Sequence, residues 1–154
     1  MKLLVSACLL GEPVRYDGQA QAVEQAQLTI WKQQGLILGY CPEVAGGLPV
    51  PRPAAERQVD GSIRTAGGTD VTAAFIRGAE ATLALCVQHD VRCALLKERS
   101  PSCGSRHIYN GRFDGSLVDG EGLTTELLRQ HGIRVFSEQQ LPEFIAYTEA
   151  QLKF

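Results

Sequence analysis

The sequence predicts an α/β fold: a small Rossmann-like three-layer domain with a short, mainly parallel sheet and a site at the C-terminal ends of its strands. Short aliphatic runs of strand length alternate with longer stretches of helical periodicity along the 154 residues. Strands that alternate with helices form βαβ units, whose parallel strands are joined by right-handed crossovers. The length suffices for one hydrophobic core, so residues 1–154 are expected to form one domain.

Four strands and four helices follow from these patterns. The expected strands cover residues 2–7, 36–40, 91–96 and 133–136. Apolar residues at helical spacing predict helices over residues 19–34, 70–90 and 123–131. In the first of these, the expected buried face includes Ile30 and Trp31. A capping box of Ser137 and Gln140 opens the last helix, whose expected buried residues are Leu141, Ile145, Thr148 and Leu152.

Glycine and proline interrupt the remaining two regions. Residues 44–68 contain Gly46-Gly47 and three prolines, which exclude a regular helix there. The pair Asp60-Gly61 predicts a small hairpin over residues 57–65, and two further turn signals predict another within residues 105–119. Long loops in compact domains commonly cover a functional site, so we expect residues 44–68 to close over one.

Composition and charge exclude several classes of function. The chain is 44% hydrophobic and carries a formal net charge of −2, which gives no electrostatic basis for binding nucleic acid. No apolar run approaches the roughly 20 residues of a membrane helix. Val5-Ser6-Ala7-Cys8 is similar to a lipoprotein cleavage site, but it lacks the apolar segment of about 7–15 residues that a signal needs. We therefore expect a cytoplasmic protein.

Three of the five cysteines share one placement. Cys8 follows the first expected strand, Cys41 follows the second, and Cys103 lies in the loop beyond the third. Parallel neighbouring strands would bring these thiols to the same end of the sheet, where open α/β sheets hold their ligands. Three converging thiolates suit zinc or an iron–sulfur cluster. The alternative is that they are small buried hydrophobes, the interpretation we give to Cys86 and Cys93.

Polar groups beside two of these cysteines are candidates for acid–base chemistry and ligand binding. Glu43, two residues after Cys41 in an apolar Gly/Pro-rich setting, would have a raised pKa if desolvated and could exchange protons with a substrate or water. By residue type alone, a surface glutamate is the commoner case. The hydroxyls of Ser100 and Ser102 could bind a ligand or cap a helix after Cys103.

The motifs around these residues form a longer pattern. It comprises Ser6-Ala7-Cys8-Leu9-Leu10-Gly11, Pro13-Val14-Arg15-Tyr16-Asp17-Gly18, Cys41-Pro42-Glu43-Val44-Ala45-Gly46-Gly47-Leu48-Pro49, Pro51-Arg52-Pro53-Ala54-Ala55-Glu56 and Ser100-Pro101-Ser102-Cys103-Gly104. The expected helix start Gly68-Thr69-Asp70-Val71-Thr72, followed by Phe75 and Gly78-Ala79, continues it. In this order, and over nearly the whole chain, the pattern resembles the thiouracil desulfurase family of bacteria.

That resemblance implies a cofactor, a reaction and a set of site residues. The cofactor would be an oxygen-sensitive [4Fe-4S] cluster with three cysteine ligands, here Cys8, Cys41 and Cys103, and one open iron that takes the substrate's thiocarbonyl sulfur. The reaction would be non-redox and would convert a small thiolated nucleobase such as 2-thiouracil to uracil and hydrogen sulfide. Glu43 would be the acid–base group, assisted by Ser100 as first choice or by Ser102. The alternative is an iron–sulfur or zinc sensor, or a sulfur carrier, without turnover.

Overall fold

Four short parallel strands form the centre of the structure, a computed structural model that describes residues 1–153. These strands are β1 (Leu3–Ser6), β2 (Ile37–Tyr40), β5 (Cys93–Leu96) and β8 (Arg134–Ser137). Their order in the sheet is β2-β1-β5-β8, and all three neighbouring pairs are parallel. Leu4 of β1 lies opposite both Leu38 and Ala94, so β1 is hydrogen-bonded on both edges. The four expected strands and their parallel arrangement are confirmed.

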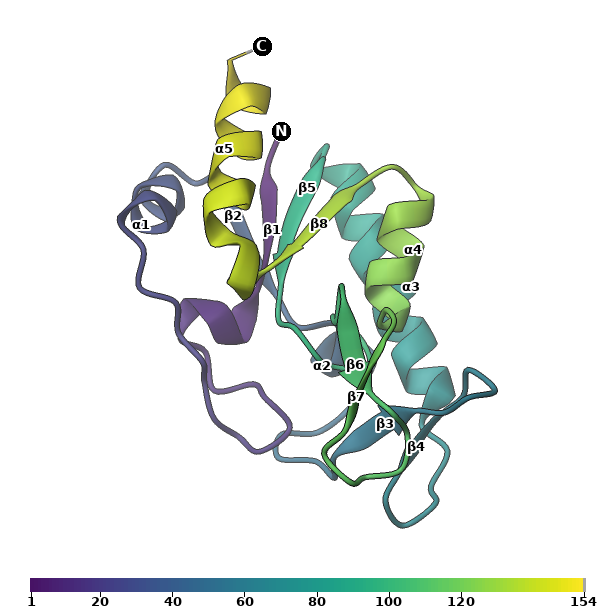
Figure 1. The fold of residues 1–154 in the computed structure, drawn as a ribbon. Coiled ribbons are helices and arrows are strands. Elements are labelled where there is room, and N and C mark those ends of the chain that lie inside the picture. Colours follow the sequence, from purple (N-terminus) through teal and green to yellow (C-terminus); the bar gives the residue numbers. More distant parts are fainter. Residues whose placement is uncertain (154) are drawn as a thin grey trace.

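Helices cover both faces of this sheet and complete the three layers (Figure 1). Helices α1 (Ala26–Gln33) and α5 (Leu141–Leu152) lie on one face, and α3 (Thr72–Gln88) and α4 (Leu123–Gln130) lie on the other. Side chains of a strand point alternately to its two faces, and β1 divides its apolar residues accordingly. Leu3 and Val5 pack with α1 and α5, whereas Leu4 packs with α3 and α4.

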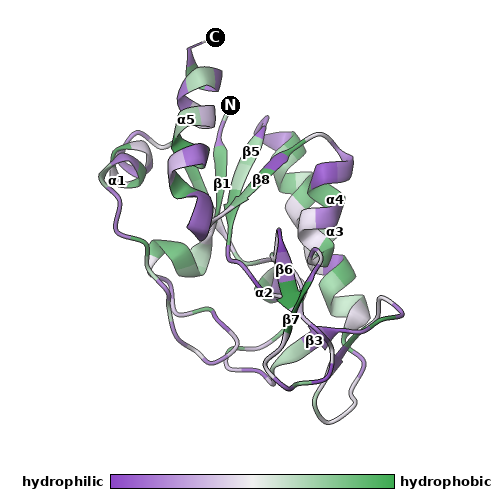
Figure 2. Cartoon of the chain, viewed as in Figure 1, coloured by the Kyte–Doolittle hydropathy of each residue, from purple (hydrophilic) through white to green (hydrophobic). Residues whose placement is uncertain are grey.

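Hydropathy follows the same layering. The two central strands of the sheet, β1 and β5, are mostly hydrophobic, whereas the helices and loops mix hydrophobic and hydrophilic residues (Figure 2). The core on one face joins Trp31 of α1 to Phe144 of α5, whose rings meet edge to face at 6.3 Å between centroids. None of the helices in residues 1–153 is both long enough and apolar enough to cross a membrane.

The short elements gather beyond the C-terminal ends of the parallel strands, opposite the two chain termini (Figure 1). They are the 3-10 helices η1 (Ala7–Leu10) and η2 (Glu138–Gln140), helix α2 (Pro42–Ala45) and the strands β3 (Ala55–Arg57), β4 (Ile63–Thr65), β6 (His107–Tyr109) and β7 (Leu117–Asp119). Strands β3 and β4 pair as one antiparallel hairpin, and β6 and β7 pair as another. Both predicted hairpins are confirmed.

The first predicted helix is wrong over its N-terminal half. Residues 19–25 run without helical structure, and α1 begins only at Ala26. The backbone N–H groups of Gln21 and Val23 donate to carbonyls of η1, at 3.0 and 2.9 Å, so this segment packs against a distant turn instead of closing its own helical bonds. Ile30, expected to be buried, is 46% exposed, because Leu28 and Trp31 are the residues of α1 that face the core.

The last predicted helix also begins differently. The capping box of Ser137 and Gln140 is present, but it opens η2, and α5 follows directly at Leu141. The buried residues of α5 are Phe144 and Thr148, and Leu152 is exposed near the end of the described chain. Leu141 and Ile145 are partly buried against the same core, and Phe144, which the spacing did not predict, is fully buried in it.

Helices α2 and α3 cross at a glycine of α3 and at the glycine that ends α2, so no side chain separates their backbones. A Cβ atom added at Gly78 of α3 would overlap the carbonyl of Pro42, and one added at Gly46 would overlap the carbonyl of Ala74. Arg77 adds hydrogen bonds to the carbonyl oxygen of Gly46, with its Nη2 at 3.1 Å. The two backbones therefore meet directly, which fixes where α2 lies at the end of β2.

We predict that Gly78→Ala lowers the free energy of unfolding, measured by urea denaturation, by about 1–3 kcal/mol because a backbone carbonyl blocks the new methyl group. Helix propensity alone would favour alanine by about 0.8–1 kcal/mol, so the sign of the change tests the packing. Gly67→Ala is the matched control, because the nearest atom to its new Cβ would be Thr65 Oγ1, 3.9 Å away. A Gly78→Ala protein at least as stable as the wild type would contradict the crossing.

Candidate functional site

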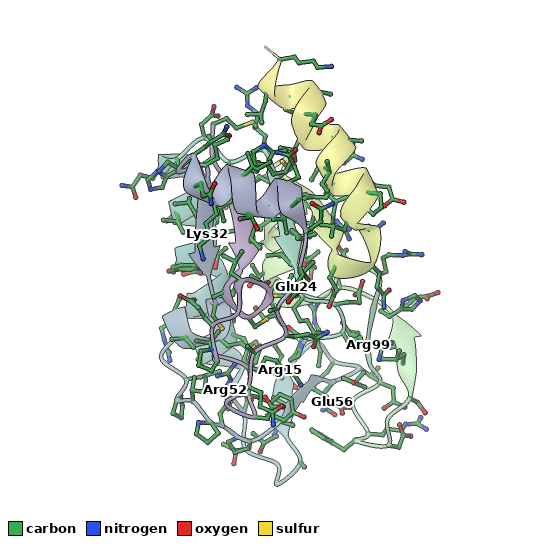
Figure 3. The ribbon with its side chains drawn as sticks, turned by 90° about the vertical axis from the view of Figure 1, so that its left-hand side faces the viewer. Arg15, Glu24, Lys32, Arg52, Glu56 and Arg99 are labelled. Atoms are coloured by element: carbon green, nitrogen blue, oxygen red, sulfur yellow. The ribbon has the colours of Figure 1, made fainter. Side chains whose placement is uncertain are left out.

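A cavity of about 660 Å³ opens at the C-terminal edge of the parallel sheet. All four strand ends contribute to its wall: Ser6 of β1, Tyr40 of β2, Lys97 after β5 and Glu138 after β8. Figure 3 shows Arg15, Arg52, Glu56 and Arg99, which also line the cavity, among the loops in the lower half of the molecule. The predicted placement of the site, at the carboxyl ends of the strands, coincides with this cavity.

Three thiols from separate strand ends line the cavity. Cys8 lies in η1 directly after β1, Cys41 is the N-cap of α2 directly after β2, and Cys103 lies in the turn that follows β5. Cys8 and Cys103 are buried, and Cys41 is half-buried. The three residues are far apart in the sequence, and the parallel topology brings them together.

The electrostatics of these thiols show that they share one environment. Burial, with a smaller contribution from a neighbouring Cys41 thiolate, raises the pKa of Cys8 to about 11. Burial also raises the pKa of Cys41, and raises that of Cys103 far above its ordinary value, with Cys41 and Glu43 adding to the effect on Cys103. Three thiolates here need a cationic partner, because each one disfavours the ionisation of the others.

The other two cysteines lie in the hydrophobic core, as predicted. Cys86 of α3 packs with Leu4 and Leu128, and burial raises its pKa to about 11. Cys93 of β5 lies on the opposite face of the sheet, with its sulfur 3.4 Å from Thr148 Oγ1.

The donor set of the cavity differs from that of a single-ion site. In residues 1–153, no three His, Cys, Asp or Glu side chains converge closely enough to hold one metal ion. A four-iron cluster does not need such convergence, because each thiolate binds its own iron atom. The cavity combines three such thiols with no histidine among its lining residues in the described chain.

Glu43 and Arg52 form a buried ion pair at the cavity wall. Arg52 Nε donates to Glu43 Oε1 at 3.1 Å, and the exposed fractions of the two side chains are 4% for Arg52 and 15% for Glu43. The other Arg52 nitrogens donate to the carbonyls of Pro49 and Val14, both at 3.1 Å. Burial raises the pKa of the Glu43 carboxyl, and Arg52 opposes that rise. Glu43 is thus fixed beside Cys41 by a guanidinium whose three nitrogens each donate a hydrogen bond.

The two candidate serines have different surroundings. Ser100 lines the cavity, and its Oγ accepts hydrogen bonds from the backbone N–H groups of Ser102 at 3.0 Å and Cys103 at 2.7 Å. Both bonds use the oxygen of Ser100 as acceptor, so its hydroxyl proton can be donated elsewhere. Ser102 is 1% exposed, and its Oγ lies 2.8 Å from Thr124 Oγ1 at the start of α4. Residues 101–103 form a turn, so Ser100 caps a turn and not a helix.

Two acidic residues of the site were missed by reasoning from the sequence. No sequence pattern assigns a role to Glu98, yet it is buried at the cavity wall. Glu138 accepts from Lys97 Nζ at 3.1 Å, which joins the ends of β5 and β8. Neither position carries a residue pattern that reveals its role, because Glu98 accepts bonds from the far end of the loop that follows it and Glu138 pairs with a residue that follows another strand.

Comparisons with known proteins show what this chain is similar to. The model of the 2-thiouracil desulfurase family matches residues 3–140. A solved structure of a [4Fe-4S]-dependent thiouracil desulfidase, TudS, is 58% identical and superposes with a TM-score of 0.94, covering 97% of this chain and 98% of its own. A Bacillus subtilis (strain 168) relative described as uncharacterized protein YbbK is 39% identical over an alignment of 152 residues, and the match covers 93% of this chain and 99% of the relative. The chain therefore belongs to the 2-thiouracil desulfurase family.

Proposed function

We propose that the protein is an enzyme that replaces the thiocarbonyl sulfur of a thiolated pyrimidine with oxygen, converting 2-thiouracil to uracil and hydrogen sulfide. The observation that carries this proposal is the meeting of three thiols from three strand ends, beside a buried carboxylate, in one cavity. The similarity to a [4Fe-4S]-dependent thiouracil desulfidase over 97% of the chain supports the same reaction class.

The residues at the cavity fit a [4Fe-4S] cluster held by Cys8, Cys41 and Cys103, with one iron left open. Sulfur donors without histidine favour a cluster, and its positive charge would offset the repulsion between the buried thiolates. The chemistry that an open iron supplies is Lewis acidity toward the thiocarbonyl sulfur and a position for the departing sulfide. All five cysteines are free thiols, consistent with the reducing, cytoplasmic location that we propose.

Glu43 would be the general acid–base group of the reaction. Water supplies the oxygen: a carbon–oxygen bond forms, the carbon–sulfur bond breaks, and both water protons leave with the sulfur as hydrogen sulfide. No electrons are exchanged, so neither an oxidant nor a reductant is needed. A carboxylate at Glu43 would accept a proton from the attacking water at one oxygen and return it to the departing sulfide. Arg52, 3.1 Å from Glu43 Oε1, keeps that carboxylate oriented.

Ser100 would hold the pyrimidine ring. Two backbone N–H groups donate to its Oγ, which polarises the hydroxyl and strengthens it as a donor. Such a donor is directed to an oxygen or nitrogen acceptor of the ring, where charge develops as water adds. Ser100 and Cys103 belong to the same turn, so substrate contact and cluster ligation are placed by one piece of backbone.

We predict that Cys8→Ala, Cys41→Ala and Cys103→Ala each lose most of the bound iron after anaerobic reconstitution, because each removes one of three ligands. Iron and sulfide per chain are the measurement. The matched controls are Cys86→Ala and Cys93→Ala, which change core thiols and should retain the wild-type iron content. Full iron content in Cys41→Ala would overturn the ligand assignment.

Glu43→Gln should retain the cluster and lose turnover. The change removes the acid–base group while keeping its size, and we expect kcat for uracil formation to fall by about 10²–10⁴-fold. Iron content and the absorption spectrum serve as the control for an intact cluster. A wild-type rate in this variant would remove Glu43 from the mechanism.

Ser100→Ala should lower kcat more than Ser102→Ala, because only Ser100 presents its hydroxyl to the cavity. Loss of one such donor typically costs about 10²–10³-fold in kcat. The two variants are matched in chemistry and lie two residues apart, so steady-state kinetics on 2-thiouracil compare them directly. The reverse order of effects would transfer the role to Ser102.

A further inference from the structure

Glu98 is a buried carboxylate without a role in the steps described above. It follows β5 directly, lines the cavity and is 2% exposed. Its Oε1 accepts hydrogen bonds from four backbone N–H groups, those of Arg99 (3.2 Å), Ser105 (2.9 Å), Arg106 (3.1 Å) and His107 (3.3 Å). Its Oε2 accepts from the Ser105 hydroxyl at 3.2 Å. One side chain thus accepts hydrogen bonds from backbone N–H groups at both ends of the loop over residues 99–107.

This arrangement keeps Glu98 ionised inside the protein. Burial alone would raise its pKa, but the N–H donors of Arg106, Ser105, His107 and Arg99 together lower it below the ordinary value. A carboxylate that accepts several backbone N–H bonds is strongly stabilised in its charged form. Without it, four backbone N–H groups would lose their acceptor, and the cost would be largest for the buried N–H of Ser105.

The loop that Glu98 closes contains two of the proposed site residues, Ser100 and Cys103. Its backbone is under constraint, because Arg99 has a left-handed φ of 74° and a Cβ at Gly104 would come within 2.9 Å of the Ser100 carbonyl oxygen. Between β5 and β6 the loop forms turns and one isolated bridge, from Arg99 to Ile108, so a sheet ladder does not fix its path.

Glu98 is itself anchored to the sheet. Its backbone N–H donates to Glu138 Oε1 at 2.8 Å, and Glu138 Oε2 pairs with Lys97 Nζ at 3.1 Å. The N–H of Lys97 donates to Ser6 Oγ at the end of β1, at 3.0 Å. These bonds join the ends of β1, β5 and β8. Glu98, whose carboxylate accepts the N–H groups of the loop, is therefore attached to the sheet, the rigid part of the fold.

We propose that Glu98 is a positioning residue that holds Cys103 and Ser100 toward the cavity by gathering the backbone N–H groups of residues 99–107. The role toward the cluster rests on the proposed function, in which Cys103 is a ligand. When a residue that orients a metal ligand is changed, metal affinity or activity commonly falls by about 10–100-fold.

The experiment compares full-length, reconstituted wild type, Glu98→Ala and Glu98→Gln under anaerobic conditions. Two readouts are taken: amide hydrogen exchange of peptides covering residues 99–107, and the rate of iron release to a chelator followed by absorbance. Glu98→Gln keeps a carbonyl oxygen for the four N–H groups, so it should restore both values to near wild type. If Glu98→Ala does not fold, Glu98→Asp, whose carboxylate is shorter by one methylene, takes its place.

Glu56→Ala is the matched control. Glu56 is also a buried carboxylate, and its Oε1 accepts from the backbone N–H groups of Gly111 at 2.9 Å and Phe113 at 3.1 Å, in the turn between β6 and β7. Its removal should accelerate exchange around residues 110–113 and leave exchange over residues 99–107 unchanged. Glu56→Ala therefore shows the effect of losing a buried carboxylate that bonds a different loop, and Glu98→Ala shows the effect of losing the carboxylate that bonds the loop of Cys103.

The proposal expects Glu98→Ala to speed exchange over residues 99–107 by about tenfold or more and iron release by about 10–100-fold. Exchange at the wild-type rate in Glu98→Ala, or iron release that Glu98→Ala and Glu56→Ala accelerate to the same extent, would overturn it. Faster exchange with unchanged iron release would contradict the ligand role of Cys103 in the proposed function, and would leave the hold of Glu98 on the loop intact.

Discussion

The parallel register of β1, β2 and β5 is the constraint on which the site depends. Because these strands run in one direction, the residues that follow each of them emerge at the same edge of the sheet. Cys8, Cys41 and Cys103 thereby meet, although 33 residues or more separate each from the next in the sequence. Helices on both faces bury the sheet and make its edge rigid, which allows irregular loops to hold a defined geometry.

Buried charged side chains bond to the backbone groups of these loops, as the hydrogen-bonded ladders of the sheet bond to those of the strands. Arg52 joins the carbonyls of Val14 and Pro49 to the carboxylate of Glu43. Glu98 gathers backbone N–H groups of the loop after β5, and Glu56 does the same for the turn between β6 and β7. Loops rich in glycine and proline have few regular partners for their backbone groups, so buried ionic side chains supply them.

The sequence predicts most of the fold because local patterns and topology agree. Cys8 and Cys41 directly follow aliphatic strands, so the rule for parallel sheets suffices to place them together. The helix predicted from residue 19 fails because the N–H groups of Gln21 and Val23 bond to η1, a contact that helical spacing cannot reveal. The role of Glu98 escapes for the same reason: its acceptor atoms serve residues seven to nine positions later, at the far end of a loop.

The central claim is that the three thiols at the sheet edge hold a catalytic iron–sulfur cluster. It is tested most directly by anaerobic reconstitution of the full chain, with iron and sulfide analysis and absorption spectra before and after addition of 2-thiouracil. The account predicts about four irons and four sulfides per chain, the content of one such cluster. It also predicts a spectral change on adding the substrate and release of uracil with hydrogen sulfide. Bound zinc, or an iron–sulfur cluster that leaves 2-thiouracil unchanged, would contradict it.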